Sequence, residues 1–244
     1  MAQSDAAGGQ GTVTVWRRLK RLLLLAVAAF LTLSITLVVL YGLVPPPITP
    51  LMVIRLFQGE GINKDWVSYD EVSPNVFKAV IAGEDARFCE HLGFDLGAIR
   101  KALQHNKKSR RLRGASTITQ QTAKNLFLWP SRGFVRKGFE AYFAVLLELF
   151  WDKRRILEVY VNVVEFGHGI YGIEAAAQAY YKKPAKDLTA DEAARLAAVL
   201  PSPLHRTPQR LPRGADLPRI RAEMRNQPAA LNDRCPVGPY EDES

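Results

Sequence analysis

The chain has 244 residues, which is enough for one ordinary domain or two small ones after any terminal segment is set aside. With 48% hydrophobic and 23% charged residues it is close to average globular usage, and this excludes a collagen, a coiled-coil rod and a chain that is disordered throughout. Only two cysteines occur, so a disulfide framework and a Cys-rich zinc site are excluded as well. The net charge of +9 indicates an anionic partner such as nucleic acid, phospholipid headgroups or a phosphorylated substrate.

Residues 22–44 form an uncharged apolar run near the start of the chain. As a helix it would be roughly 34 Å long, enough for a hydrocarbon core of about 30 Å. A cleaved signal peptide is the alternative, but this run is longer than a signal's apolar core and residues 44–47 offer no small-residue cleavage site. We therefore expect an uncleaved anchor. Four cations in residues 17–21 precede it, so the positive-inside rule puts residues 1–21 in the cytoplasm and exports the rest.

The exported part shows mainly helical signals with a small extended portion. Residues 45–70 hold β-prone runs at 51–57 and 66–69, which predict an extended tether or a hairpin. Ser73 followed by Pro74 predicts the start of a helix. Further helices are expected from a cap at Ser116 to about residue 128, over 136–150, from a cap at Asp152 to about 163, through 175–180, and from a capping box of Thr189 and Glu192 to Pro201. Residues 209–244, rich in Pro and Arg, predict a loosely packed tail.

The distribution of charge is the most informative feature. Between Asp95 and Glu140 no residue is acidic, yet eleven are Lys or Arg. Seven of these lie in residues 100–113, and a solvated basic face or a face resting on anionic lipid explains that cluster as well as a binding site does.

A second group of residues points to a phosphate or pyrophosphate site. Gln120 and Gln121 lie four and three positions before Lys124, so one helix face presents amide donors beside a cation. A helix start at Ser116 would add free backbone N–H groups and the positive end of a helix dipole.

A carboxylate stands at each edge of this acid-free stretch. Glu84 ends an apolar helix and precedes Phe88, so partial burial would raise its pKa toward that of a useful base. Glu140 follows Arg136 and Lys137 by four and three positions, and an ordinary intrahelical salt bridge explains it as well as catalysis does.

Four motifs follow one another in order along the chain. Residues 84–93 (EDARFCEHLG) fit E-D-x-x-F-x-x-H-x-G, and residues 114–121 (GASTITQQ) fit G-x-S-T-I-T-Q-Q. Residues 136–140 (RKGFE) fit R-K-x-x-E, and residues 155–162 (RILEVYVN) fit R-I-L-E-x-Y-x-N. With these motifs the chain resembles the peptidoglycan glycosyltransferases, glycosyltransferase family 51, from about Pro47 to Pro208. Ala115, where the motif often has a second glycine, is a small departure that removes no functional group.

The resemblance implies a fold and a domain organisation. We expect a mainly α, lysozyme-like glycosyltransferase domain of two lobes, a head and a jaw, behind a single N-terminal transmembrane helix. Bifunctional members also carry a transpeptidase domain with S-x-x-K, but no serine here has a lysine three positions later. The chain therefore looks like the monofunctional form. The boundaries that we expect are a cytoplasmic basic tail at 1–21, the anchor at 22–44, the glycosyltransferase domain at 45–208 and the C-terminal tail at 209–244.

The resemblance also implies an activity and partners. The enzyme would polymerise lipid II by transferring the growing lipid-linked glycan chain onto the GlcNAc 4-hydroxyl, with inversion and release of undecaprenyl pyrophosphate. It would be a single-pass protein of the bacterial inner membrane with a periplasmic catalytic domain. Lipid II, the lipid-linked chain, the membrane and other cell-wall synthesis or division proteins would be its partners, and nucleic acid would not.

The motifs also imply roles for particular residues. Glu84 would be the general base, and Glu140 would organise the pyrophosphate pocket, bind a divalent cation or assist departure of the leaving group. A Mg²⁺ or Mn²⁺ ion is an expectation by analogy only. The substrate-binding residues implied by the motifs and the cations near them are Asp85, Phe88, Ser116, Gln120, Gln121, Lys124, Asn125, Arg132, Arg136 and Lys137.

Two other functions stay open at this point. A lytic, lysozyme-like hydrolase would share the fold and a catalytic glutamate. A non-catalytic membrane scaffold of the wall-synthesis machinery would use the basic face to recruit partners. Cys89 and Cys235 could pair in an oxidising compartment, but the sequence does not establish that they are close.

Overall fold

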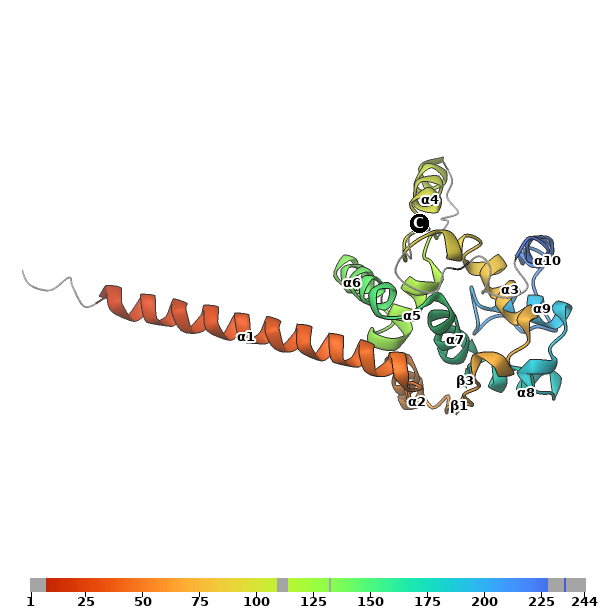
Figure 1. The fold of residues 1–244 in the computed structure, drawn as a ribbon, viewed down its shortest axis with the longest axis horizontal. Helices are drawn as coiled ribbons and strands as arrows, with labels where there is room; N and C mark the ends of the chain where they lie inside the picture. Colours follow the sequence, from red (N-terminus) through yellow and green to blue (C-terminus); the bar gives the residue numbers. More distant parts are fainter. Residues whose placement is uncertain (1–7, 109–113, 132, 228–234, 236–244) are drawn as a thin grey trace, which may run out of the picture. The chain divides into compact units, whose positions relative to one another are not determined.

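The computed structural model describes residues 8–108, 114–131, 133–227 and 235 (Figure 1). The chain divides after Val44 into two units, which are described separately. In the first, helix α1 (Gly8–Leu43) contains a stretch, Val15–Leu43, that is long and apolar enough to cross a membrane. The apolar helix expected over 22–44 is therefore present within a longer helix, and its last residue is Leu43.

The second unit is mainly helical, as predicted. Its α-helices are α2 (Pro50–Phe57), α3 (Pro74–Glu84), α4 (Leu96–Lys108), α5 (Ile118–Phe127), α6 (Phe134–Phe150), α7 (Lys153–Val163), α8 (Ile173–Tyr181), α9 (Ala190–Val199) and α10 (Leu217–Met224). Short 3-10 helices lie at η1 (Tyr69–Glu71), η2 (Phe88–Glu90) and η3 (Ala185–Asp187). The strands are β1 (Asn63–Lys64), β2 (Glu165–Gly167) and β3 (Ile170–Tyr171).

Helix starts follow the capping signals in the sequence, with one shift. Ser73 caps α3 ahead of Pro74, and Asp152 caps α7 by accepting from the Arg155 N–H at 2.6 Å. Thr189 and Glu192 form the predicted capping box of α9. The predicted cap of α5 at Ser116 is wrong by one position, because Thr117 forms the capping box with Gln120.

The prediction of an extended run at residues 51–57 is wrong. This segment is helix α2, with Thr49 accepting a hydrogen bond from Met52 N–H at 3.3 Å and Pro50 at the first helical position. Like the Ser73–Pro74 pair before α3, the Thr49–Pro50 pair combines a capping hydroxyl with a first-turn proline. This start signal outweighs the β-propensity of the apolar residues that follow.

Two groups of helices and a small sheet position the site. Helix α3 packs against α9 and α10, and α5 packs against α6 and α7 (Figure 1). The sheet has the order β1-β3-β2, with β1 parallel and β2 antiparallel to β3. Gly172, which precedes α8, has φ +84°, and a Cβ there would lie 2.7 Å from the Asn162 carbonyl oxygen. Glycine therefore lets this turn lie against the end of α7.

The segment after Pro208, predicted to be a loose tail, contains a packed helix where the structure describes it. Ile220 and Met224 of α10 are buried, 2% and 7% exposed, because the helix covers apolar residues of α3. Cys235 also lies in the predicted tail and forms a disulfide with Cys89. The described part of this segment is thus tied to the domain.

Candidate active site

Glu84 is the last residue of α3, and its half-buried side chain reaches α5. Its Oε2 accepts a hydrogen bond from Gln121 Nε2 at 2.7 Å. Tyr160 on α7 donates from its hydroxyl to Gln121 Oε1 at 3.1 Å, so the amide is held from both sides. Burial raises the pKa of Glu84, against the lowering effects of the Gln121 hydrogen bond and the Lys124 charge. The upward shift of this pKa is the direction that the sequence predicts.

Lys124 lies one turn after Gln121 on α5 and is near Glu84. Burial lowers the pKa of Lys124, while the charges of Glu140 and Glu84 raise it. Among the described residues Lys124 forms no ion pair, whereas nearby Arg136 and Lys137 both pair with Glu140. A partly buried cation without a protein counterion is suited to an anionic ligand.

One pocket joins these residues to helix α2, strand β2 and the chain that follows α9. Its volume is about 480 Å³. It is lined by Leu51, Arg55, Gln121, Lys124, Asn125, Leu128, Pro130, Ser131, Arg136, Val164, Glu165, Leu200, Pro201 and Pro203. The pocket is therefore lined by four of the predicted substrate residues: Gln121, Lys124, Asn125 and Arg136. Glu84 is connected to the pocket by its hydrogen bond from Gln121.

The start of α5 is not available to an anion in the way that the sequence suggested. Asp85 accepts a hydrogen bond from Ile118 N–H at 3.0 Å, and Thr117 accepts one from Gln120 N–H at 3.2 Å. Gln120 in turn accepts from Thr117 N–H at 3.2 Å. These N–H groups are already bonded, and a carboxylate already occupies the positive end of the helix dipole. Positive charge for a phosphate must come from side chains.

Asp85 and Phe88 connect the motif around Glu84 to its neighbours. The second oxygen of Asp85 lies 2.9 Å from His91 Nε2. Phe88 is fully buried, with the Lys153 ammonium 4.5 Å from its ring centroid. In the structure both side chains stabilise the loop between α3 and α4, and neither lines the pocket described above.

Glu140 on α6 is buried, 3% exposed, and bonded to two cations. Arg136 donates to its Oε2 at 2.6 Å, and Lys137 contacts its Oε1. Lys137 Nζ also donates to Ser116 Oγ at 3.1 Å, which links α6 to the segment before α5. The salt bridge that the sequence left open is therefore present.

This environment does not fit the divalent cation expected at Glu140. Its carboxylate oxygens face two positive side chains, and the described residues contain no group of three His, Cys, Asp or Glu side chains placed to hold a metal. A hard divalent cation needs several oxygen ligands and would be repelled here.

Some of the remaining basic residues fall within the described part of the chain and some do not. Arg132 lies outside the described residues, and so do residues 109–113 of the basic cluster. Arg100 and Lys101 lie on α4, which contributes no residue to the pocket around Lys124.

Sequence reasoning missed two charged residues that also line the pocket. Arg55 on α2 lies 3.2 Å from Glu165 on β2, and both line the cavity. Burial raises the pKa of Glu165, and the Arg55 charge lowers it. The only signal for Glu165 was an acid among the apolar residues 163–166, and none singled out Arg55, because it lies on the helix predicted to be extended.

Comparison with known proteins gives the family. Residues 52–225 match the sequence profile of the family described as Transglycosylase. The chain belongs to this family. The match begins within α2, includes α10 and extends past Pro208, so the family's pattern includes residues 209–225 of the segment predicted to be a tail.

Curated relatives of this transglycosylase agree with the family predicted from the motifs. It is 56% identical over 189 residues to the "Biosynthetic peptidoglycan transglycosylase" of Caulobacter vibrioides, covering 77% of this chain and 82% of the relative. It is 55% identical over 194 residues to the protein of that name from Bdellovibrio bacteriovorus, covering 77% and 78%. For the one from Rhodospirillum centenum the identity is 53% over 194 residues, covering 79% and 84%.

Proposed function

We propose that this transglycosylase polymerises the glycan strands of peptidoglycan from lipid II. The growing lipid-linked chain is transferred onto the 4-hydroxyl of the GlcNAc of an incoming lipid II, and undecaprenyl pyrophosphate leaves. One observation supports this above others: Gln121 donates a hydrogen bond to the carboxylate of Glu84 and lines the same pocket as Lys124, which has no ion-pair partner among the described residues. The carboxylate that would act as the base therefore lies next to the pocket that contains the cation, with Gln121 between them.

Glu84 acts as the general base in this proposal. Its carboxylate takes the proton of the acceptor hydroxyl while that oxygen forms a bond to the anomeric carbon of the donor. The bond from this carbon to the pyrophosphate oxygen breaks with its electron pair, so the α configuration of the donor becomes β. Such a base contributes about 10²–10⁴-fold to the rate. Burial supports the role, because it raises the pKa of Glu84 toward neutral pH.

The leaving pyrophosphate is stabilised by charge. Lys124 and Arg136 line the pocket, and Lys124 has no counterion among the described residues. Pyrophosphate is a good leaving group that needs neutralisation of its charge more than a proton, and a cation fixed in advance in a partly buried site supplies this. Glu140 orients Arg136 and supports the protonated state of Lys124 by its negative charge.

The anchor brings the enzyme to its substrate. The polyprenyl tail of lipid II stays in the bilayer, so a tethered enzyme meets it at a higher effective concentration. Helix α1 has the length and composition of a single span, and the cations at residues 17–21 favour a cytoplasmic N-terminus. In this proposal the catalytic domain lies on the outer face of the inner membrane, where other wall-synthesis and division proteins would be its partners.

The test compares two substrates. Purified full-length protein in detergent or vesicles is given lipid II, and the products are separated by length, with intact cell-wall sacculi in a parallel reaction. We expect long glycan strands from lipid II and no digestion of sacculi. Digestion of sacculi without polymerisation would show a lysozyme-like hydrolase instead, and activity on neither substrate would favour a scaffold.

A further inference from the structure

The last turn of α3, which carries Glu84, is held by a side chain from α10. Arg219 donates from Nη1 to the carbonyl oxygen of Ala82 at 2.9 Å and from Nη2 to that of Gly83 at 3.1 Å. The last carbonyls of an α-helix have no partner within the helix. A guanidinium that bonds two of them also places positive charge at the negative end of the helix dipole.

Close packing sets α10 against this turn. Ile220, next to Arg219, is buried, and its Cδ1 would lie 3.5 Å from a Cβ added at Gly83. That separation is an ordinary van der Waals contact, so α10 lies directly against the turn that carries Glu84. Arg219 itself is half exposed, so it contributes little to the core.

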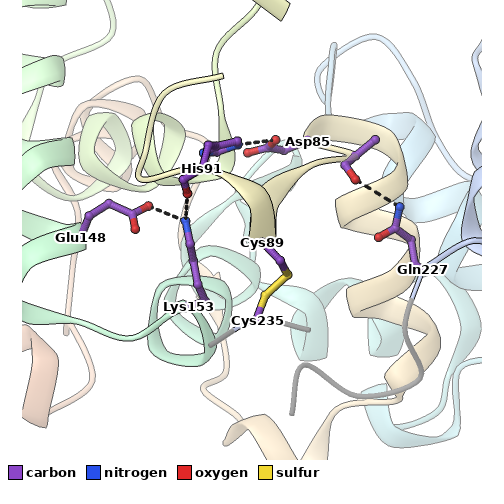
Figure 2. The surroundings of a disulfide bond; sticks show 8 residues. Asp85, Cys89, His91, Glu148, Lys153, Gln227 and Cys235 are labelled. Atoms are coloured by element: carbon purple, nitrogen blue, oxygen red, sulfur yellow. Dashed lines mark hydrogen bonds and ion pairs between the residues drawn. A yellow bond between two sulfur atoms is a disulfide. The ribbon is translucent and has the colours of Figure 1, made fainter. Parts of the chain in front are cut away.

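The same C-terminal segment also contacts the chain just after Glu84. Gln227 donates to the carbonyl oxygen of Ala86 at 3.3 Å, and Cys235 is joined to Cys89 by a disulfide across a sequence separation of 146 residues. Figure 2 shows the disulfide at the loop that also carries Asp85 and its bond to His91. Contacts from one segment thus flank Glu84 on both sides in the sequence.

The charge of Arg219 reaches Glu84 as well. It lowers the pKa of Glu84, as does that of Lys124 on α5, while burial and the neighbouring Asp85 raise it. Tyr160 on α7, whose own pKa is raised well above its usual value by burial, also interacts electrostatically with this carboxylate. Loss of the Arg219 charge therefore favours the protonated, inactive form of the base.

We propose that Arg219 is a positioning residue for the general base, and that Arg219, Gln227 and Cys235 together form a clamp that holds the backbone on both sides of Glu84. The inference rests on the proposed role of Glu84. The clamp fixes the direction of a catalytic side chain at a helix end, where the backbone would otherwise fray. None of these three residues lines the pocket around Lys124.

Arg219→Gln and Arg219→Lys test the clamp, with Arg221→Gln as the matched control. Arg221 lies on the same helix but pairs with Asp191 of α9, away from Glu84. Polymerisation of lipid II by the full-length protein is measured across pH for kcat and KM. We expect Arg219→Gln to lower kcat about 3- to 10-fold at nearly constant KM. The low-pH limb of its kcat profile (the acid limb) should move to higher pH, while Arg219→Lys and Arg221→Gln keep the wild-type acid limb.

Cys235→Ser is the second arm of the test, because it loosens the clamp but leaves the Arg219 charge in place. It should lower kcat without moving the acid limb. Wild-type kcat in Cys235→Ser, or a kcat and acid limb in Arg219→Gln equal to those of the control, would overturn the clamp. Glu84→Gln is measured in parallel: high activity in that variant would remove Glu84 as the base, which is a failure of the proposed function and a different result.

Discussion

Replacing Tyr160 by Phe removes one hydroxyl from the fully buried end of the Tyr160–Gln121–Glu84 chain. The hydroxyl donates to Gln121 Oε1, and the Gln121 amide nitrogen donates to Glu84 Oε2. An amide can rotate by half a turn and exchange its oxygen and nitrogen, and the Tyr160 donor selects the orientation that presents N–H to the base. Without it, Gln121 is free to turn its oxygen toward the carboxylate.

The size of the effect follows from one neutral hydrogen bond, which contributes about 0.5–1.5 kcal/mol net. If this free energy no longer helps to hold Glu84 in its active position, kcat falls by about 2- to 13-fold. The direction of the pH effect follows from Gln121, whose hydrogen bond lowers the pKa of Glu84. A weaker bond raises that pKa further, so the acid limb of the kcat profile moves to higher pH.

The assay is the initial rate of lipid II polymerisation across pH, with Tyr181→Phe as the matched control. The Tyr181 hydroxyl is also buried but has no hydrogen-bond partner among the described residues, so its removal should change neither kcat nor the acid limb. A Tyr160→Phe enzyme with the rate and pH profile of the control would refute the idea that Gln121 must be oriented to serve Glu84.

Three other changes act on other parts of the site. Lys124→Met should lower kcat about 10²–10³-fold and leave the melting temperature within a few degrees of wild type, because it removes the cation proposed to bind the pyrophosphate; a loss below about tenfold would place the pyrophosphate elsewhere. Glu140→Gln should destabilise the domain by about 1–3 kcal/mol in denaturant unfolding, since two cations lose their partner. It should also move the alkaline limb to lower pH, because the Glu140 charge raises the pKa of Lys124. Cys235→Ser should lower stability by about 2–5 kcal/mol, as should reduction of the wild type; equal melting temperatures would show that the disulfide does not form in solution.

The family, the mainly α fold and most helix starts could be predicted from the sequence, because their signals are local. Ser73, Asp152 and Thr189 act on N–H groups two or three positions away, so the residues that decide each helix start stand next to it. The same reasoning failed at residues 51–57, where an apolar run was given more weight than the Thr49–Pro50 start signal.

The parts of the site that depend on distant contacts could not be predicted. Gln120 and Gln121 looked equivalent on one helix face, yet Gln120 serves the capping box and only Gln121 reaches Glu84. The choice depends on Asp85 and Tyr160, which approach α5 from α3 and α7. Helix α10 gave a weak signal because it is short and begins with a Leu-Pro pair, and its stability comes from packing on α3.

The most direct test of the account is the rate of glycan polymerisation by Glu84→Gln, which keeps the shape of the side chain and removes its basicity. Circular dichroism and the melting temperature would first confirm that the variant folds. The account predicts that strand formation from lipid II falls by at least about 100-fold at every pH, with lipid II still bound. A folded Glu84→Gln enzyme that makes strands at the wild-type rate would contradict it.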